Sequence, residues 1–335
     1  MYLSFYNMMF FSTLVMGTLL SISSVTWFGA WTGLELNLIS FIPLIIINNN
    51  QYSSEAALKY FLIQALGSAI IIFSASIVLL SVNMFSMLIT SALLLKMGAA
   101  PFHFWLPYIM EGLLWPQLII LMTIQKLAPI FLITHLIHLK MSSIIIIMSS
   151  LLSSIIGAIM GMNQISLRKL MAFSSINHMA WMLVSLMISD SMLIFYFSFY
   201  CLISISVMLL FHFQQSYYFN HLMSYSKMST ELKVLISASL LSLGGLPPLT
   251  GFIPKWILIQ ELTTSNMFIM LMVLIPSALI MLYFYLRLSL SFLSLNSTKF
   301  KMLLKQANPQ KFILTSLFFY FNLFTLIIPS LFILF

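Results

Sequence analysis

The sequence predicts an all-α, polytopic membrane protein, a helical bundle that forms a single membrane domain over residues 1–335. Hydrophobic residues make up 61% of the chain, whereas charged residues make up only 6%. The mean hydropathy is +1.09, although soluble domains carry about 25% charged residues. Apolar stretches of about 20 residues, the length that crosses a bilayer core, recur from one end to the other.

About eleven transmembrane helices are predicted, separated by polar turns such as Asn48-Asn49-Asn50 and Ser189-Asp190-Ser191. The spans are 2–22, 25–47, 55–81, 84–110, 112–138, 142–161, 166–188, 191–215, 230–263, 266–292 and 311–334. The first span lacks a basic leader and a small-residue cleavage site, so we expect it to be retained as a helix.

The distribution of basic residues predicts the orientation of the chain. The formal net charge of +8 comes from 14 basic and 6 acidic residues, and the basic residues are spread over loops, which argues against a nucleic-acid partner. The loops on the side of the N-terminus hold Lys59, Arg168, Lys169, Lys227, Lys233, Arg287, Lys299, Lys301, Lys305 and Lys311. The opposite side holds essentially Lys140. The positive-inside rule therefore places the N-terminus on the matrix or cytoplasmic side and the C-terminus across the membrane.

Two of the apolar spans share a spacing of helix-breaking residues, which predicts an internal repeat. The matching positions are Gly98, Pro101 and Pro107 in one span and Gly245, Pro248 and Pro254 in the other. Five helices separate them, so the two elements run in opposite directions, as in transporters built from inverted repeats with discontinuous helices. We expect two inverted five-helix repeats, at about 2–138 and 142–292, followed by a C-terminal helix at 311–334.

Four ionisable residues lie within the predicted spans: Glu35, Lys96, Lys126 and Lys255. A charge at the centre of a membrane helix costs about 2.5 to 3.5 kcal/mol on insertion scales, so such residues are usually functional. Each has a proline nearby, and a broken helix at membrane depth is tolerated where protein or water satisfies the backbone. We interpret them as a hydrated axis for protons or ions, with Glu35 as the partner of the lysines. The alternative is a static ion pair with snorkelling amines that hold helices together.

Two histidines are candidates for a proton relay. His103 follows the first predicted break and His178 lies within the seventh span. Neither has a metal-ligand partner at suitable spacing on its helix, so we predict no metal site. The alternative for each is a hydrogen-bonded core histidine.

No cofactor motif is recognised in the sequence. The single cysteine, Cys201, excludes an internal disulfide and an iron–sulfur cluster held by this chain alone. A Gly-rich dinucleotide motif, a P-loop and a histidine pair for haem are all missing, so binding of NADH, ATP or haem by this chain is not expected.

A family resemblance rests on motifs that occur in a fixed order between about residue 17 and residue 290. They are Trp31-Thr-Gly-Leu-Glu35-Leu-Asn, Ser54-Glu-Ala-Ala-Leu-Lys59-Tyr-Phe, Lys96-Met-Gly-Ala-Ala-Pro-Phe-His-Phe-Trp-Leu-Pro107, Gln125-Lys-Leu-Ala-Pro129, Arg168-Lys-Leu-Met-Ala-Phe-Ser-Ser-Ile-Asn-His178 and Leu243-Gly-Gly-Leu-Pro-Pro-Leu-Thr-Gly-Phe-Ile-Pro-Lys-Trp256. The chain resembles the antiporter-like membrane subunits of respiratory complex I, and among them subunit 2 of mitochondrial NADH dehydrogenase.

The resemblance implies a role for each candidate residue. Glu35 corresponds to the carboxylate of the first half-channel and Lys96 to its paired lysine. Lys126 corresponds to the central connecting lysine and Lys255 to the lysine on the exit side. His103 and His178 correspond to relay residues.

The resemblance also implies a core membrane-arm subunit of proton-pumping NADH:ubiquinone oxidoreductase in the mitochondrial inner membrane, with the N-terminus in the matrix and the C-terminus in the intermembrane space. NADH, FMN, the iron–sulfur clusters and ubiquinone would then belong to other subunits, because this chain carries no redox centre. The implied partners are other membrane-arm subunits, accessory subunits and membrane lipid, with cardiolipin among the candidates.

Three other interpretations are weighed against this one. The same lysine axis would serve a stand-alone or multi-subunit cation/proton antiporter, and partnership would distinguish the two. A purely structural subunit would use its charges only to lock helices together. An enzyme with its own quinone site is a third alternative, but the sequence has no recognisable quinone-pocket signature.

Overall fold

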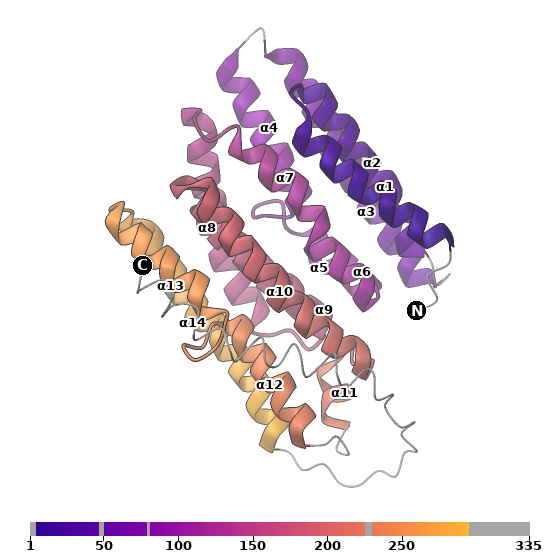
Figure 1. Ribbon diagram of the computed structural model, residues 1–335, viewed down its shortest axis with the longest axis vertical. Coiled ribbons are helices and arrows are strands. Elements are labelled where there is room, and N and C mark those ends of the chain that lie inside the picture. Colours follow the sequence, from indigo (N-terminus) through magenta and orange to yellow (C-terminus); the bar gives the residue numbers. More distant parts are fainter. Residues whose placement is uncertain (1–4, 47–49, 79–80, 225–229, 295–335) are drawn as a thin grey trace. The chain divides into compact units, whose positions relative to one another are not determined.

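The computed structural model of the chain describes residues 5–46, 50–78, 81–224 and 230–294 (Figure 1). This part of the chain contains fourteen α-helices and no named strand, with one isolated β-bridge between Ser166 and Tyr218. The predicted all-α fold class is therefore confirmed. The predicted C-terminal helix at 311–334 lies outside the described residues.

Within the described residues, eight helical spans are long and apolar enough to cross a membrane, and two further apolar helices are shorter. The shorter ones, at 82–97 and 233–244, are the first halves of the two spans in which a break was predicted. Discontinuity thus explains why neither of them reaches the length of a full span.

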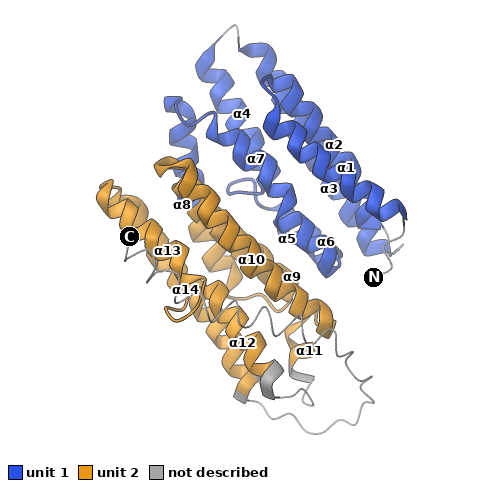
Figure 2. Cartoon of the chain, viewed as in Figure 1, with its two compact units in different colours: residues 1–153 blue, residues 154–335 orange. Residues whose placement is uncertain are grey.

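The chain divides into two compact units, residues 1–153 and residues 154–335 (Figure 2). The first unit contains α1 (Phe5–Ser23), α2 (Trp27–Ile46), α3 (Gln51–Ile77), α4 (Val82–Met97), α5 (Trp105–Gly112), α6 (Trp115–Met122) and α7 (Ile124–Thr134). In this unit α3 packs against α2, α4 and α5, and α7 packs against α1 and α4. The boundary between the units falls within α8 (Lys140–Gly161).

Helices α1 and α2 approach each other closely through glycine. A Cβ atom at Gly33 would lie 2.5 Å from the backbone nitrogen of Ser21 and 2.8 Å from the carbonyl oxygen of Gly17. Only a residue without a side chain fits between the two backbones there. Glu35 lies two residues beyond this crossing.

The break between α4 and α5 begins at Gly98, whose φ of +73° is the left-handed conformation common after the last turn of a helix. The backbone N–H of Gly98 donates to the carbonyl of Leu95, and that of Ala99 donates to the carbonyl of Leu94. The chain then passes through a cis Ala100–Pro101 peptide bond before α5 begins. The predicted interruption of span 84–110 is confirmed.

The predicted span 112–138 is also interrupted, but not at Pro129, the proline near Lys126. Helix α6 ends at Met122 and α7 begins at Ile124, with Thr123 between them at φ −112° and ψ −78°. Helix α7 continues through Pro129. Lys126 therefore stands in the first turn of a new helix.

The second unit contains α9 (Leu167–Ile188), α10 (Asp190–Gln214), α11 (Phe219–Ser224), α12 (Thr230–Gly244), α13 (Phe252–Thr264) and α14 (Phe268–Ser294). Helix α9 lies at its centre, in contact with α10, α13 and α14. Nearly all of its residues are buried. The short helix α11 was not predicted.

Helix α8 and α9 also meet at a glycine. A Cβ atom at Gly157 would lie 2.7 Å from the backbone nitrogen of Asn177, and the side chain of Asn177 donates to the carbonyl of Ser154. Gly157 therefore allows α8 and α9 to pack closely.

The second predicted break separates α12 from α13 and again uses a left-handed glycine. Gly245 has a φ of +86° and donates its N–H to the carbonyls of Leu241 and Ser242. A Cβ atom at Gly251 would overlap the carbonyl oxygen of Ser242, so the turn folds back directly onto α12. Both breaks thus begin with a glycine in the left-handed backbone conformation.

Candidate functional site

Three lysines are buried, each at an end that a helix break creates. Lys96, Lys126 and Lys255 are 6%, 2% and 4% exposed. Lys96 lies in the last turn of α4, Lys126 in the first turn of α7 and Lys255 in the first turn of α13. Burial of a charged amine is unfavourable unless neighbouring groups replace the hydrogen bonds it makes to water. The neighbours of each lysine therefore indicate what role it can have.

In the first unit, Lys96 and Lys126 line the same cavity. Its volume, measured as space open to water, is about 20 Å³, which accommodates about one water molecule. The polar lining consists of Asn37, Tyr60, Gln64, Lys96, Gln125 and Lys126. The remaining lining is apolar or aromatic, so the cavity is a small polar space in an apolar surround.

Helix α3 supplies one wall of this cavity through residues spaced at i, i+4 and i+7. The side-chain amide of Gln64 donates a 3.3 Å hydrogen bond to the carbonyl oxygen of Lys96, and the hydroxyl of Tyr60 donates a 3.2 Å bond to Oε1 of Gln125. A Cβ atom at Gly67 would lie 3.1 Å from Cγ of Lys96. The glycine therefore leaves room for the alkyl chain of the lysine.

Glu35 lies on α2, next to residues that line the cavity. Its side chain is half-buried, and Leu34, Asn37 and Leu38, rather than Glu35, line the cavity from α2. The carboxylate acts electrostatically on Lys96, yet within the described residues no ion pair joins the two. The pairing of Glu35 with Lys96 therefore stays a prediction, supported by this electrostatic interaction.

His103 is buried in the turn between α4 and α5 and lies outside the cavity lining. Its Nδ1 atom lies 3.2 Å from the carbonyl oxygen of Pro101, and its ring centroid lies 4.3 Å from that of Phe104. The structure thus places His103 at the first break but not between the two lysines.

In the second unit, Lys255 reaches back across the break to the end of α12. Its Nζ atom donates a 2.9 Å hydrogen bond to the carbonyl oxygen of Gly244. A Cβ atom at Gly245 would lie 2.9 Å from that same Nζ atom. The glycine therefore serves both the left-handed backbone and the space that the amine occupies.

His178 lies in the buried middle of α9 among aromatic rings of α10. Its Nδ1 atom lies 3.0 Å from the hydroxyl oxygen of Tyr196, and its ring centroid lies 5.2 Å from that of Tyr200. Trp181 stacks on Tyr196 with an interplanar angle of 3°. These contacts fix the orientation of the imidazole, which a relay residue needs.

The sequence comparisons assign the chain to a family. The family model described as NADH:quinone oxidoreductase/Mrp antiporter, TM matches residues 24–281. NADH-ubiquinone oxidoreductase chain 2 of Anopheles gambiae is 47% identical over 326 residues, which cover 94% of this chain and 94% of that protein. This chain belongs to the NADH-ubiquinone oxidoreductase chain 2 family.

Other members and a solved structure agree with this assignment. The chain 2 protein of Locusta migratoria is 41% identical over 298 residues, which cover 87% of this chain and 86% of that protein. A chain of respiratory complex I from Thermus thermophilus with bound aureothin matches with a TM-score of 0.86 at 22% identity, over 97% of this chain and 78% of that chain. At this identity the structural likeness concerns the fold.

To bind a metal ion, this member of the chain 2 family would need a cluster of ligating side chains. Across the described ranges, no cluster of three or more His, Cys, Asp or Glu side chains has a geometry that could hold a metal ion. Cys201 is half-buried in α10.

The cavity residues Asn37, Tyr60, Gln64 and Gln125 were not predicted as site residues. Their signal was present, since polar side chains within apolar spans are costly to bury and are often functional. The i, i+4 spacing of Tyr60 and Gln64 could have placed both on one face of α3. Their common partner, the end of α4 beside Lys96, could be identified only from the tertiary structure.

Proposed function

We propose that this chain is a membrane-arm subunit of proton-translocating NADH:ubiquinone oxidoreductase and that protons cross the membrane through its buried polar residues. The observation that carries the proposal is the cavity shared by Lys96 and Lys126. Two amines facing one small polar space can exchange a proton through an intervening water, because a charged amine is a donor and a neutral amine is an acceptor. Membership of the chain 2 family supports the proposal.

Each candidate residue has a role in this path. Lys126 is the central lysine, Lys96 is its neighbour, and the carboxylate of Glu35 acts electrostatically on Lys96. In the second unit Lys255 is the exit-side lysine and His178 a relay. His103 is a relay residue at the first break.

The energy for transport comes from outside this chain. Moving one charge against the potential requires about 2.3 kcal/mol per 100 mV, and rearranged charges in a poorly solvated interior interact with energies of that size. Electron transfer from NADH through FMN and iron–sulfur clusters to ubiquinone would take place in other subunits. Its coupling to this chain is conformational or electrostatic.

The proposal includes a location and partners. The chain is a multi-pass protein of the mitochondrial inner membrane, with its N-terminus in the matrix and its C-terminus in the intermembrane space, as the distribution of basic residues favours. Its partners are other membrane-arm subunits, accessory subunits and lipids such as cardiolipin. The chain is built from two inverted five-helix repeats, at about 2–138 and 142–292, followed by a C-terminal helix.

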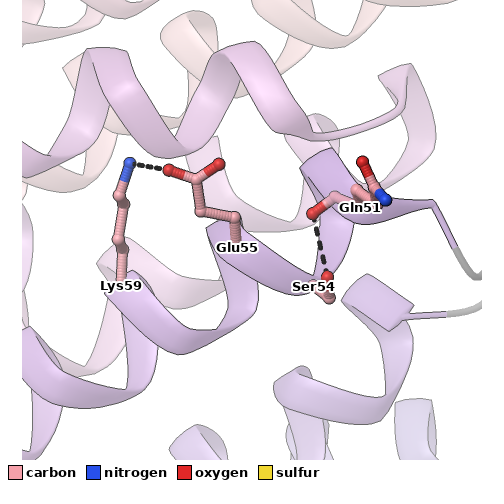
Figure 3. Close-up of polar contacts among 4 residues, drawn as sticks. All are labelled: Gln51, Ser54, Glu55 and Lys59. Atoms are coloured by element: carbon pink, nitrogen blue, oxygen red, sulfur yellow. Dashed lines mark hydrogen bonds and ion pairs between the residues drawn. The ribbon is translucent and has the colours of Figure 1, made fainter.

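The test uses the Lys126→Met and Glu35→Gln variants of the assembled complex, reconstituted in liposomes. We expect both variants to lower the number of protons pumped per electron transferred. The matched control is Lys59→Met, because Lys59 forms an exposed pair with Glu55 one turn away on α3 (Figure 3). Unaltered pumping in fully assembled Lys126→Met and Glu35→Gln complexes would exclude the mechanism and favour a purely structural subunit.

A cation/proton antiporter is the second candidate, favoured by the family description, which includes Mrp antiporters. Mild detergent extraction, a native gel and mass spectrometry distinguish the two. Co-migration with an assembly that oxidises NADH and reduces quinone supports the respiratory function. Migration alone, or only with other antiporter-like chains, supports ion exchange.

A further inference from the structure

Three helices of the second unit meet at the end of α8. A Cβ atom at Gly161, the last residue of α8, would lie 3.1 Å from the ring of Phe284 on α14 and 3.5 Å from Cβ of Phe173 on α9. The hydroxyl oxygen of Tyr285 on α14 lies 4.0 Å from Sδ of Met171 on α9. Because Met171 precedes Phe173 while Tyr285 follows Phe284, these contacts indicate that α9 and α14 run antiparallel.

Two basic residues lie one turn beyond these contacts, toward the end at which α9 begins and α14 finishes. Lys169 precedes Phe173 by four residues, and Arg287 follows Phe284 by three. Residues three or four positions apart are neighbours on one helix face. The two cations therefore extend from neighbouring helices in the same direction, beside the end of α8.

The preceding residue of α9 has a different environment. The guanidinium carbon of Arg168 lies 4.8 Å from the ring centroid of Tyr217, in the connection before α11. Successive residues of a helix point about 100° apart, which is why Arg168 meets this connection while Lys169 shares the face of Phe173.

Both cations lie at the level expected for lipid headgroups. Helices α8 and α9 have 22 residues each, a length of about 33 Å, whereas a hydrocarbon core is about 30 Å thick. Lys169 lies in the first turn of α9. Arg287 lies about 29 Å along α14 from Phe268. Each of them is thus placed near a membrane boundary, where basic side chains meet phosphate groups.

An exposed apolar face of α14 leads to Arg287. Leu279 and Tyr283 are 62% and 59% exposed, and they precede Arg287 at intervals of four residues, so the three share one face. Helix α14 contains one of the candidate membrane spans. An acyl chain that lies on Leu279 and Tyr283 would therefore bring its headgroup to the level of Arg287.

Arg287 is available to such a headgroup. Its side chain is exposed, and within the described residues no carboxylate forms an ion pair with it. A protein carboxylate could also bind a guanidinium, but the apolar face that leads to Arg287 favours a ligand that carries acyl chains.

We propose that the phosphate of an anionic phospholipid binds between Arg287 and Lys169, beside the end of α8, with an acyl chain on the exposed face of α14. The guanidinium presents N–H groups in a fork that matches two phosphate oxygens, and the ammonium adds a compact charge. Cardiolipin, which carries two phosphates, can use both cations. This inference assigns a site to the lipid partnership proposed above and does not depend on proton translocation.

The test measures lipid binding by the complete complex, purified in mild detergent and depleted of lipid. The complex is titrated with cardiolipin, and bound lipid is counted by mass spectrometry. Arg287→Gln and Lys169→Gln should each weaken the binding of one cardiolipin about tenfold or more, the effect of a lost hydrogen bond to a charged group. Arg287→Lys, which keeps the charge, should weaken it less. Lys140→Gln is the matched control, because it removes the same charge from the exposed beginning of α8.

Two results would overturn the inference: binding in both variants equal to that in Lys140→Gln, or displacement of cardiolipin by inorganic phosphate, which would make free phosphate the ligand. Phosphatidylcholine should bind equally to all variants. Since lipid is counted without turnover, failure of this site leaves the proposed function standing. Unaltered pumping in Lys126→Met would in turn leave the lipid site standing.

A second measurement needs no variant. Cryo-electron microscopy of the complete wild-type complex should show headgroup density between the side chains of Arg287 and Lys169, continuous with acyl-chain density along Leu279 and Tyr283. A carboxylate of a neighbouring subunit in that place, or a map without density there, would contradict the inference.

Discussion

The amine of Lys255 is bound to the carbonyl oxygen of Gly244, the last residue of the helix that ends before the break, at 2.9 Å. The side chain of a lysine in the first turn of α13 thus binds the backbone at the end of α12. The neighbouring Gly245 makes this possible, because its left-handed backbone turns the chain and its missing side chain leaves space for the amine.

Substitution of Gly245 should disturb this arrangement in two ways. Gly245→Ala places a Cβ atom 2.9 Å from Nζ of Lys255, and a residue other than glycine in the left-handed region is strained by about 1 to 2 kcal/mol. We expect a lower unfolding temperature and slower pumping. Gly244→Ala is the control, because its Cβ would meet only ordinary contacts at 3.4 Å or more. Equal effects of the two substitutions would contradict this account of Gly245.

A larger residue in place of Gly67 should displace the side chain of Lys96, because the two residues are in contact. In Gly67→Val, the Cβ atom 3.1 Å from Cγ of Lys96 and the added methyl groups displace the lysine chain from the cavity wall. We expect slower proton pumping, measured in proteoliposomes. Ala69→Val is the matched control, since Ala69 is exposed on the same helix. Pumping at the rate of the control would show that Lys96 tolerates the displacement.

Gln117 should stabilise the end of α2. Its Nε2 atom donates to the carbonyls of Leu44 and Ile45 at 2.7 Å and 3.0 Å, and its Oε1 atom accepts from the N–H of Leu114. Gln117→Leu leaves these buried backbone groups without their partner, so we expect a loss of about 1 to 3 kcal/mol in unfolding free energy. Thermal unfolding of the assembled complex, with the exposed Gln51→Leu variant as reference, measures it. A difference of less than about 0.5 kcal/mol from the reference would contradict the expectation.

The hydroxyl of Tyr196 should matter for His178. Tyr196→Phe keeps the aromatic stack on Trp181 but removes the group 3.0 Å from Nδ1 of His178. If His178 is a relay, we expect slower pumping and an altered pH profile of pumping, since the imidazole loses the contact that fixes it. Tyr283→Phe, at an exposed position of α14, is the control. A pH profile identical to that of the control would assign His178 to the core instead.

The sequence predicted the broken helices at 98 and 245 because glycine followed by proline leaves few backbone alternatives. It did not predict the break at Thr123, where neither residue type occurs. Pro129 indicated a different place, yet α7 continues through it because only the carbonyl of Gln125 loses its helical donor.

The sequence predicted which residues of the candidate site are buried, but it did not predict which face of each helix meets the cavity. Apolar spans reveal which residues are buried, so the burial of Lys96, Lys126 and Lys255 could be expected. Helix α2 is apolar on nearly all faces, so its sequence does not indicate which face meets the polar cavity. For this reason the sequence did not predict that Asn37 lines the cavity.

The glycine-capped ends of α4 and α12 have a consequence for the charges of the two lysines beside them. The C-terminal end of a helix carries about half a negative elementary charge from its aligned peptide dipoles. Lys96 stands in the last turn of α4, and Lys255 binds the terminal carbonyl of α12. Part of the countercharge for each amine therefore comes from the backbone itself. Unlike a carboxylate, this countercharge cannot be protonated, so it does not depend on the protonation state of either lysine.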